Sequence, residues 1–142
     1  MFLKRVVEII NTHPRKRVRK KSIAHLVRGV LKGERVRSRE LNVVFVNDRE
    51  MKRLNKKFLS HNAITDVISF RLDDNEHIEG EVYVNLDQAE RQAREFRVKE
   101  HTEVGRLVVH GVLHLVGYKD DTPDKRKVMQ TLEDKYLQWK NR

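Results

Sequence analysis

Apolar residues recur along this chain at two alternating spacings, which predict helices and short strands. Between about Arg17 and Lys32 they follow the i, i+3, i+4, i+7 spacing of one helical face, and Gly33 is placed to end that helix. The apolar, β-branched run Leu41–Val46 predicts a strand. Similar patterns predict further strands over Arg5–Asn11, Asp66–Leu72 and Gly80–Asn85, and further helices after Asp48 and over Asp87–Phe96, Glu100–Val116 and Pro123–Lys140.

These elements predict an α+β fold, with a small mixed sheet of about four strands packed with about five helices. Composition shows no linker-like change along the 142 residues, so residues 1–142 are expected to form a single domain that includes the basic segment 1–40. No apolar run approaches the length of a membrane span, and the opening MFLKRVVEII is too charged for a signal peptide. We therefore expect a soluble, cytoplasmic protein without a membrane partner.

Positive charge is concentrated near the N-terminus. Residues 1–40 hold 13 Lys and Arg against 3 acidic residues, whereas the rest of the chain holds 18 of each, so this segment carries the whole net charge of +10. Its densest part is RKRVRKK, residues 15–21. Such a surface attracts nucleic acid through phosphate contacts that release counterions. A solvated basic face, or a heat-adapted surface rich in ion pairs, is the alternative.

The segment HGVLHLVGYKDD, residues 110–121, has the spacing of metal ligands. His110 and His114 lie one turn apart on one face of a predicted helix, and Gly117 allows a left-handed turn that brings Asp120 back toward them. The chain has no cysteine, so a metal site must use His, Asp or Glu. The spacing predicts an open three-ligand metal site at the end of a central helix, in which His110 and His114 act through the bound metal. Partnered core histidines are the alternative.

The residue after the first histidine narrows the chemistry. Zinc peptidases of the His-Glu-x-x-His type carry their glutamate base where this chain has Gly111, so the motif argues against peptide hydrolysis. Phosphodiester cleavage depends more on positioning and on neutralising phosphoryl charge, which suits a metal beside a basic surface. A set of two histidines and one carboxylate also occurs in iron oxygenases, which therefore stay a further alternative.

Two motifs resemble the signatures of the YbeY family of bacterial endoribonucleases. They are HGVLHLVGY, His110–Tyr118, and LN...TDVISF, Leu54–Phe70. The similarity covers most of residues 40–137 and includes the tail helix with Met129 and Glu133. It implies an α+β fold and a metal-dependent, single-strand-specific endoribonuclease. Family members act in the cytoplasm in ribosomal RNA maturation, especially at the 3′ end of the small-subunit RNA, and in ribosome quality control.

The resemblance also implies a cofactor and partners. We expect one divalent metal ion, zinc first, while nickel, iron or manganese also suit two histidines and a carboxylate. The implied partners are single-stranded or ribosomal RNA, the ribosome or its small subunit, and an assembly GTPase. Lys57, Thr65, Asp66 and Ser69 are candidate substrate-binding residues, and Asp66 is also a candidate to orient a ligand histidine. The last three residues could instead end a loop and begin a strand.

The chain departs from the family pattern at two positions. Asp120 stands where the family usually has a third histidine, and Asp121 is the alternative ligand, although the register favours Asp120. Leu59 stands where the family has an arginine after the aromatic residue, and leucine cannot bind phosphate. These departures favour a second hypothesis, a ribosome-associated RNA-binding assembly factor with weak or no hydrolytic activity. The remaining histidines lack ligand spacing and are expected at the surface: His13, His25, His61, His77 and His101.

Overall fold

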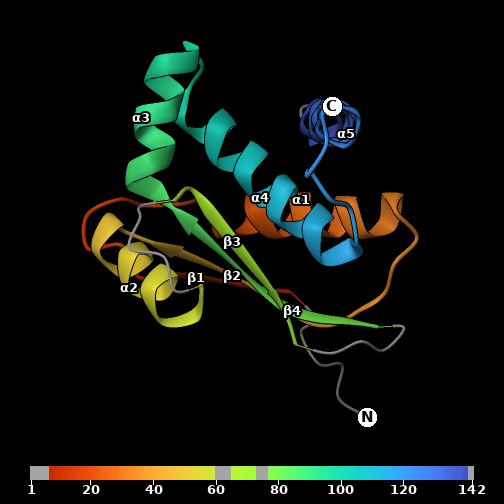
Figure 1. The fold of residues 1–142 in the computed structure, drawn as a ribbon, viewed down its shortest axis with the longest axis horizontal. Helices are drawn as coiled ribbons and strands as arrows, with labels where there is room; N and C mark the ends of the chain where they lie inside the picture. Colours follow the sequence, from red (N-terminus) through yellow and green to blue (C-terminus); the bar gives the residue numbers. More distant parts are fainter. Residues whose placement is uncertain (1–6, 60–64, 73–76, 141–142) are drawn as a thin grey trace.

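The computed structural model describes residues 7–59, 65–72 and 77–140, which form four strands and five helices (Figure 1). None of these helices is both long and apolar enough to cross a membrane. The predicted surface residue His61 lies outside the described residues. In chain order the elements are β1 (Val7–Asn11), α1 (Lys20–Gly33), β2 (Ser38–Val46), α2 (Asp48–Leu59), β3 (Val67–Arg71), β4 (Ile78–Asn85), α3 (Leu86–Phe96), α4 (Glu100–Val116) and α5 (Pro123–Lys140).

The four strands form one mixed sheet in the order β1-β2-β4-β3. β1, β2 and β4 run parallel, and β3 pairs antiparallel with β4 at one edge. Parallel neighbours need crossover connections, which α1 supplies between β1 and β2, and α2 with β3 supplies between β2 and β4. The predicted α+β class and mixed sheet are confirmed.

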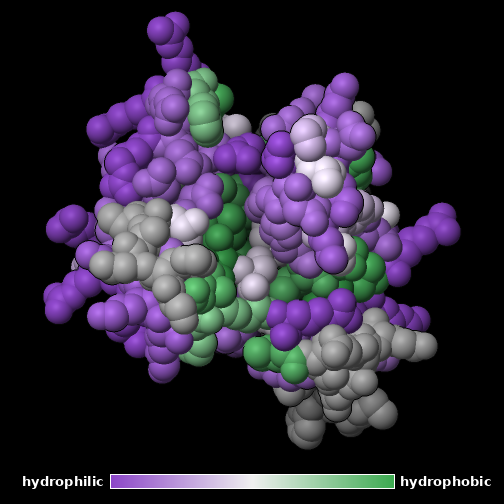
Figure 2. All heavy atoms as spheres, in the orientation of Figure 1, coloured by the Kyte–Doolittle hydropathy of each residue, from purple (hydrophilic) through white to green (hydrophobic). Residues whose placement is uncertain are grey.

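Alternate strand residues face two different helical layers. Val43 and Phe45 of β2 belong to the main core under α1 and α4, whereas Val44 of β2 packs with Met51 and Leu54 of α2 on the opposite face. Figure 1 shows α2 on one side of the sheet and α1 and α4 on the other. α4 contacts α1, α3, α5, β3 and β4, so it is the central helix. On the face in Figure 2, apolar side chains gather in a seam between the hydrophilic surfaces of α3 and α5.

A glycine lets α4 lie very close to the sheet. A Cβ atom on Gly111 would stand 2.4 Å from Val82 Cγ1 and 3.1 Å from Ser69 Oγ, so a side chain has no room there. The Ser69 hydroxyl donates a 2.8 Å hydrogen bond to the Gly111 carbonyl oxygen. This contact fixes α4, and with it His110 and His114, against the edge of the sheet.

Three elements, β2, β4 and α1, begin two or three residues away from their predicted starts. β2 begins at Ser38 and β4 at Ile78, ahead of their apolar runs, because these two strands already pair at Ser38 and Ile78. In β2 the polar residues at the start conceal the strand in the hydropathy pattern, and in β4 a charged residue, Glu79, follows the apolar Ile78. α1 begins at Lys20, three residues after the predicted start. The prediction that the first apolar run forms a strand is confirmed. The structure describes this strand, β1, over Val7–Asn11.

The prediction that His13 lies at the surface is wrong. Its side chain is buried, and its Nε2 atom lies 2.8 Å from Asp87 Oδ1. Its Nδ1 atom accepts hydrogen bonds from the backbone N–H groups of Arg15 and Lys16, so Nε2 carries the ring proton and donates it to Asp87. Every polar atom of the ring thus has a partner, which makes its burial favourable. Three other predicted surface histidines are exposed, as expected: His25, His77 and His101.

The packing of α4 gives a stability prediction. Gly111→Ala should lower the free energy of unfolding by about 1–3 kcal/mol, because the added methyl group overlaps Val82 in a packed core. Gly105→Ala is a matched control on the same helix, where the nearest atom is the flexible end of Leu137 at 3.1 Å. Its higher helix propensity should keep that variant within about 1 kcal/mol of the wild type. Denaturant unfolding checks both, and equal stabilities would contradict the packing argument.

Candidate metal centre

The predicted ligands His110, His114 and Asp120 meet at the end of α4. The two Nε2 atoms lie 3.0 Å apart, and Asp120 Oδ2 lies 3.4 Å from each of them. The side chains of His110, His114 and Asp120 are 20%, 29% and 42% exposed, so the group opens to solvent on one side. Asp121, the alternative ligand, points elsewhere, because its carboxylate pairs with Lys125 at 3.1 Å.

The end of α4 explains how Asp120 returns to the histidines. Gly117 has a φ of 122°, a conformation that side chains rarely adopt, and follows the last helical residue. The N–H of Tyr118 donates to the Leu113 carbonyl, and the N–H of Gly117 donates to that of His114. This is the hydrogen-bond pattern of a Schellman motif, which closes a helix and reverses the chain. The reversal carries residue 120 back to the ligand face, as the glycine in the sequence predicts.

Hydrogen bonds behind the two imidazoles determine which ring nitrogens are bare. The Nδ1 atom of His110 lies 2.8 Å from Glu133 Oε2, and that of His114 lies 2.9 Å from the Tyr118 carbonyl oxygen. Both partners are acceptors, so each Nδ1 carries a proton, and the tautomer of each imidazole that these contacts select has its lone pair on Nε2. The two Nε2 lone pairs and the Asp120 carboxylate are therefore three acceptors that converge on one point. A metal ion bound between them would satisfy all three acceptors.

The spacing of these atoms fits a metal ion. Tetrahedral ligands about 2.1 Å from a zinc ion lie about 3.4 Å from one another. The two distances from Asp120 Oδ2 are 3.4 Å, and the Nε2–Nε2 distance of 3.0 Å is slightly shorter. Three protein ligands with an exposed side leave a position for water or substrate, which is the arrangement of catalytic rather than structural sites.

A buried ionic network supports His110 from behind. Glu133 of α5 is 2% exposed and contacts Arg106 of α4 at 3.1 Å, and Arg106 also binds Glu103 at 2.5 Å. Burial lowers the pKa of His110, but the hydrogen bond to Glu133 and the nearby carboxylates outweigh it, so the pKa is raised. The hydrogen bond to Glu103 likewise raises the pKa of Arg106. Arg106 places its positive charge beside both buried carboxylates, and Glu133 accepts the hydrogen bond from His110 Nδ1.

The candidate substrate-binding residues lie in different places. Ser69 binds the Gly111 carbonyl and thus joins β3 to α4. Asp66 accepts a hydrogen bond from the N–H of Val67 at the start of β3, and its charge helps to raise the pKa of His110. The Thr65 carbonyl oxygen accepts from Asn85. These residues therefore shape the strand beside the metal group, and their role in substrate binding stays a prediction.

The two notable residues of α2 lie on the other face of the sheet from α4. Lys57 is exposed, and its ammonium group lies 5.2 Å from the centre of the Phe58 ring. Leu59, in the position of the family arginine, is 42% exposed at the end of the helix. The structure does not join Lys57 to the metal group, so its contact with RNA stays a prediction.

Sequence reasoning missed the role of Glu133. It proposed Asp66 as the residue that orients a ligand histidine, but the hydrogen bond to His110 comes from Glu133. A signal was present, because Met129, Glu133 and Tyr136 follow helical spacing and share the buried face of α5. A single carboxylate on an otherwise apolar face indicates a buried partner.

Nearly the whole chain matches a known family: residues 8–141 fit the family model described as endoribonuclease YbeY. The chain belongs to the YbeY family. An endoribonuclease YbeY of Chlorobium limicola is 37% identical over 131 residues, which are 92% of this chain and 90% of the relative. That of Chlorobium luteolum is 38% identical over 116 residues, or 82% and 85%. A solution structure from Thermotoga maritima, 30% identical, superposes with a TM-score of 0.64 and covers 92% of this chain and 86% of its own.

Membership of the YbeY family confirms the resemblance that the two sequence motifs carry. It places the chain in a family of metal-dependent endoribonucleases, which are hydrolases, rather than among peptidases or oxygenases. Within the described part of the chain, His110, His114 and Asp120 form a group that could hold a metal ion.

The two neighbouring aspartates give a direct test of the ligand set. Asp120→Asn should weaken zinc binding by more than about 100-fold, because it removes the charged ligand rather than a group behind one. Asp121→Asn is the matched control and should bind zinc as the wild type does, since its carboxylate pairs with Lys125. Competition with a chromogenic chelator measures both. Equal affinities in the two variants would rule out Asp120 as the third ligand.

The hydrogen bond behind His110 gives a second test. Glu133→Gln should weaken zinc binding about 10- to 100-fold, because the amide holds the Nδ1 proton less strongly and the imidazole becomes a poorer ligand. Asp134→Asn, at the next and exposed position of α5, is the control and should leave the affinity unchanged. Circular dichroism establishes that each variant is folded. Wild-type affinity in folded Glu133→Gln would show that this carboxylate has no part in metal binding.

Proposed function

We propose that this chain is a single-strand-specific endoribonuclease that acts in ribosomal RNA maturation, at the 3′ end of the small-subunit RNA, and in ribosome quality control in the cytoplasm. The observation that supports it is the convergence of three acceptors, His110, His114 and Asp120, on one open position. We infer that they hold one divalent ion, zinc first, with nickel, iron or manganese as alternatives. The small ribosomal subunit and an assembly GTPase are the partners that we propose.

The residues around the centre favour phosphodiester over peptide hydrolysis. When bound, a divalent ion there supplies Lewis acidity and an activated water. Glu133 and the Tyr118 carbonyl hold the two imidazoles in the ligating tautomer. Gly111 lies against Val82 of the sheet, so this position offers no room for the glutamate base of a peptidase. The net charge of +10 draws a polyanionic strand toward the protein.

One observation favours the second candidate, an RNA-binding assembly factor with weak or no hydrolysis. Leu59 exposes an uncharged side chain in the position of the family arginine. A phosphate contact is therefore missing there, and cations elsewhere on the chain must supply it. This candidate predicts RNA binding with a steep salt dependence and no turnover with zinc, manganese, nickel or iron.

A variant of one ligand tests the catalytic proposal. His114→Ala should lower the rate of single-stranded RNA cleavage by about 100-fold or more while the fold survives, because it removes a metal ligand at the half-exposed end of α4. His25→Ala, at an exposed position of α1, is the control and should cleave at the wild-type rate. A gel assay on a precursor of the small-subunit RNA measures both. Cleavage that persists in metal-stripped His114→Ala would refute the proposal.

A further inference from the structure

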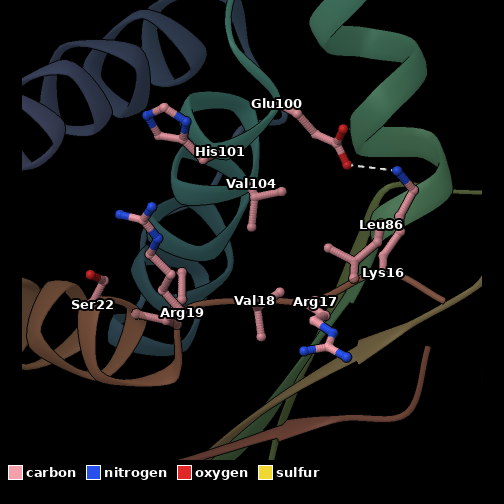
Figure 3. A pocket seen from close by; sticks show the side chains of 10 residues that line it. Lys16, Arg17, Val18, Arg19, Ser22, Leu86, Glu100, His101 and Val104 are labelled. Atoms are coloured by element: carbon pink, nitrogen blue, oxygen red, sulfur yellow. Dashed lines mark hydrogen bonds and ion pairs between the residues drawn. The ribbon is translucent and has the colours of Figure 1, made fainter. Parts of the chain in front are cut away.

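We propose that a cavity at the other end of α4 is a second RNA-binding site, which takes two backbone phosphates of a strand far from the metal centre. The cavity has a volume of about 560 Å³ and lies between the start of α1, the start of α4 and the segment that precedes α1. Figure 3 shows Arg19 and His101 on one side of it and Lys16 and Glu100 on the other. The inference rests on the proposed function, because it takes RNA as the ligand.

The charges that line the cavity leave it cationic. The carboxylate of Glu100 is neutralised by Lys16, whose ammonium group lies 2.8 Å from it and 3.0 Å from Glu90. Arg17 and Arg19 also line the cavity, and within the described part of the chain neither guanidinium makes an ion pair. Figure 3 shows the two guanidinium groups on different sides of the cavity, so each is placed to bind a different phosphate of one strand.

The start of α1 gives an energetic reason for an anion at this place. The first turn of the helix holds no acidic residue and begins with Lys20 and Lys21, and the side chain of Arg19 makes no capping hydrogen bond. Positive side chains at the positive end of a helix are unfavourable, and backbone N–H groups of the first turn lack a side-chain acceptor. A phosphate in the cavity would offset both costs. The start of α1, next to Arg17 and Arg19, is therefore less stable than a capped helix end would be. Such local loss of stability is common at functional sites.

The position of the cavity determines which part of an RNA strand it contacts. His101 precedes His114 by 13 residues on α4, which corresponds to about 20 Å along the helix axis. The phosphates in the cavity therefore do not include the one that is cut. At a stacked spacing of about 3.4 Å per nucleotide, about six nucleotides separate the two sites. The cavity should therefore strengthen the binding of long strands and leave short ones unaffected.

Removal of two charges distinguishes binding in the cavity from general attraction of RNA to the basic segment 1–40. Arg17→Gln/Arg19→Gln is compared with Arg28→Gln/Lys32→Gln, a control that removes two exposed charges of α1 outside the cavity. Fluorescence anisotropy measures the binding of metal-loaded protein to 2′-O-methyl RNA of about 4 and about 16 nucleotides, the usual range of strand-binding sites. Gels after each titration establish that the RNA is intact.

Loss of two phosphate contacts should reduce the salt slope for the long RNA by about 1.4. The wild type should bind the long RNA more tightly than the Arg17/Arg19 variant does. The ratio of these two affinities should fall about sevenfold when the salt concentration rises from about 50 to about 200 mM. The short RNA should bind both proteins equally, and the control variant should keep the wild-type slope.

Equal salt slopes for the two double variants would overturn the proposal, as would an equal loss of affinity for the short RNA. Unchanged RNA binding together with lost binding of an acidic peptide would assign the cavity to a protein partner instead, and would also overturn it. A protein that cleaves no RNA with any metal would refute the proposed nuclease function alone. The binding comparison would still decide the second site, because it uses RNA that is not cut.

Discussion

The close approach of α4 to the sheet at Gly111 is the constraint on which the metal centre depends. At Gly111 the helix presents no side chain of its own, so its backbone lies directly against side chains of β3 and β4. The Ser69 hydroxyl donates a hydrogen bond to the Gly111 carbonyl oxygen. His110 precedes Gly111 by one residue, and His114 follows it by three. This one contact between α4 and the sheet therefore fixes the positions of both imidazole rings. The absence of a glutamate base at this position is therefore also a packing requirement. A longer side chain would have to push the helix, and the ligands with it, away from the strands.

A second constraint acts through charge. Arg106 contacts the buried carboxylate of Glu133 and also that of Glu103. Glu103 accepts a further hydrogen bond from Gln92 of α3. Each member of this network has a partner, which is the condition under which buried charges are tolerated. The network joins α3, α4 and α5 behind the centre. It ends on the Nδ1 atom of His110, so packing among three helices selects the tautomer that leaves Nε2 available to a metal.

Local patterns in the sequence predicted the fold class, each helix and strand of the described residues, and the meeting of His110, His114 and Asp120. The ligands were accessible to this reasoning because one helical turn and one glycine turn bring residues 110, 114 and 120 together within 11 positions of the chain. The missed features depend on residues far apart in sequence. Glu133 reaches His110 across 23 positions, and His13 is buried because Asp87 meets it across 74. Spacing along one helix or strand carries no information about such pairs, although a lone carboxylate on the buried face of α5 was a readable signal.

The dipole of α4 favours ligands of opposite charge at the two ends of this helix. A helix presents partial negative charge at its C-terminus and partial positive charge at its N-terminus. The converging acceptors at His110 and His114 lie at the negative end, where a cation is favoured, and the cavity beside Arg17 and Arg19 lies at the positive end, where an anion is favoured. Leu59, which is exposed at the end of α2, carries no charge that could bind a phosphate. In the proposed second site, Arg17 and Arg19 supply phosphate contacts at the opposite end of α4, about 20 Å along the helix from the metal group, so their positive charge would not oppose a metal ion there.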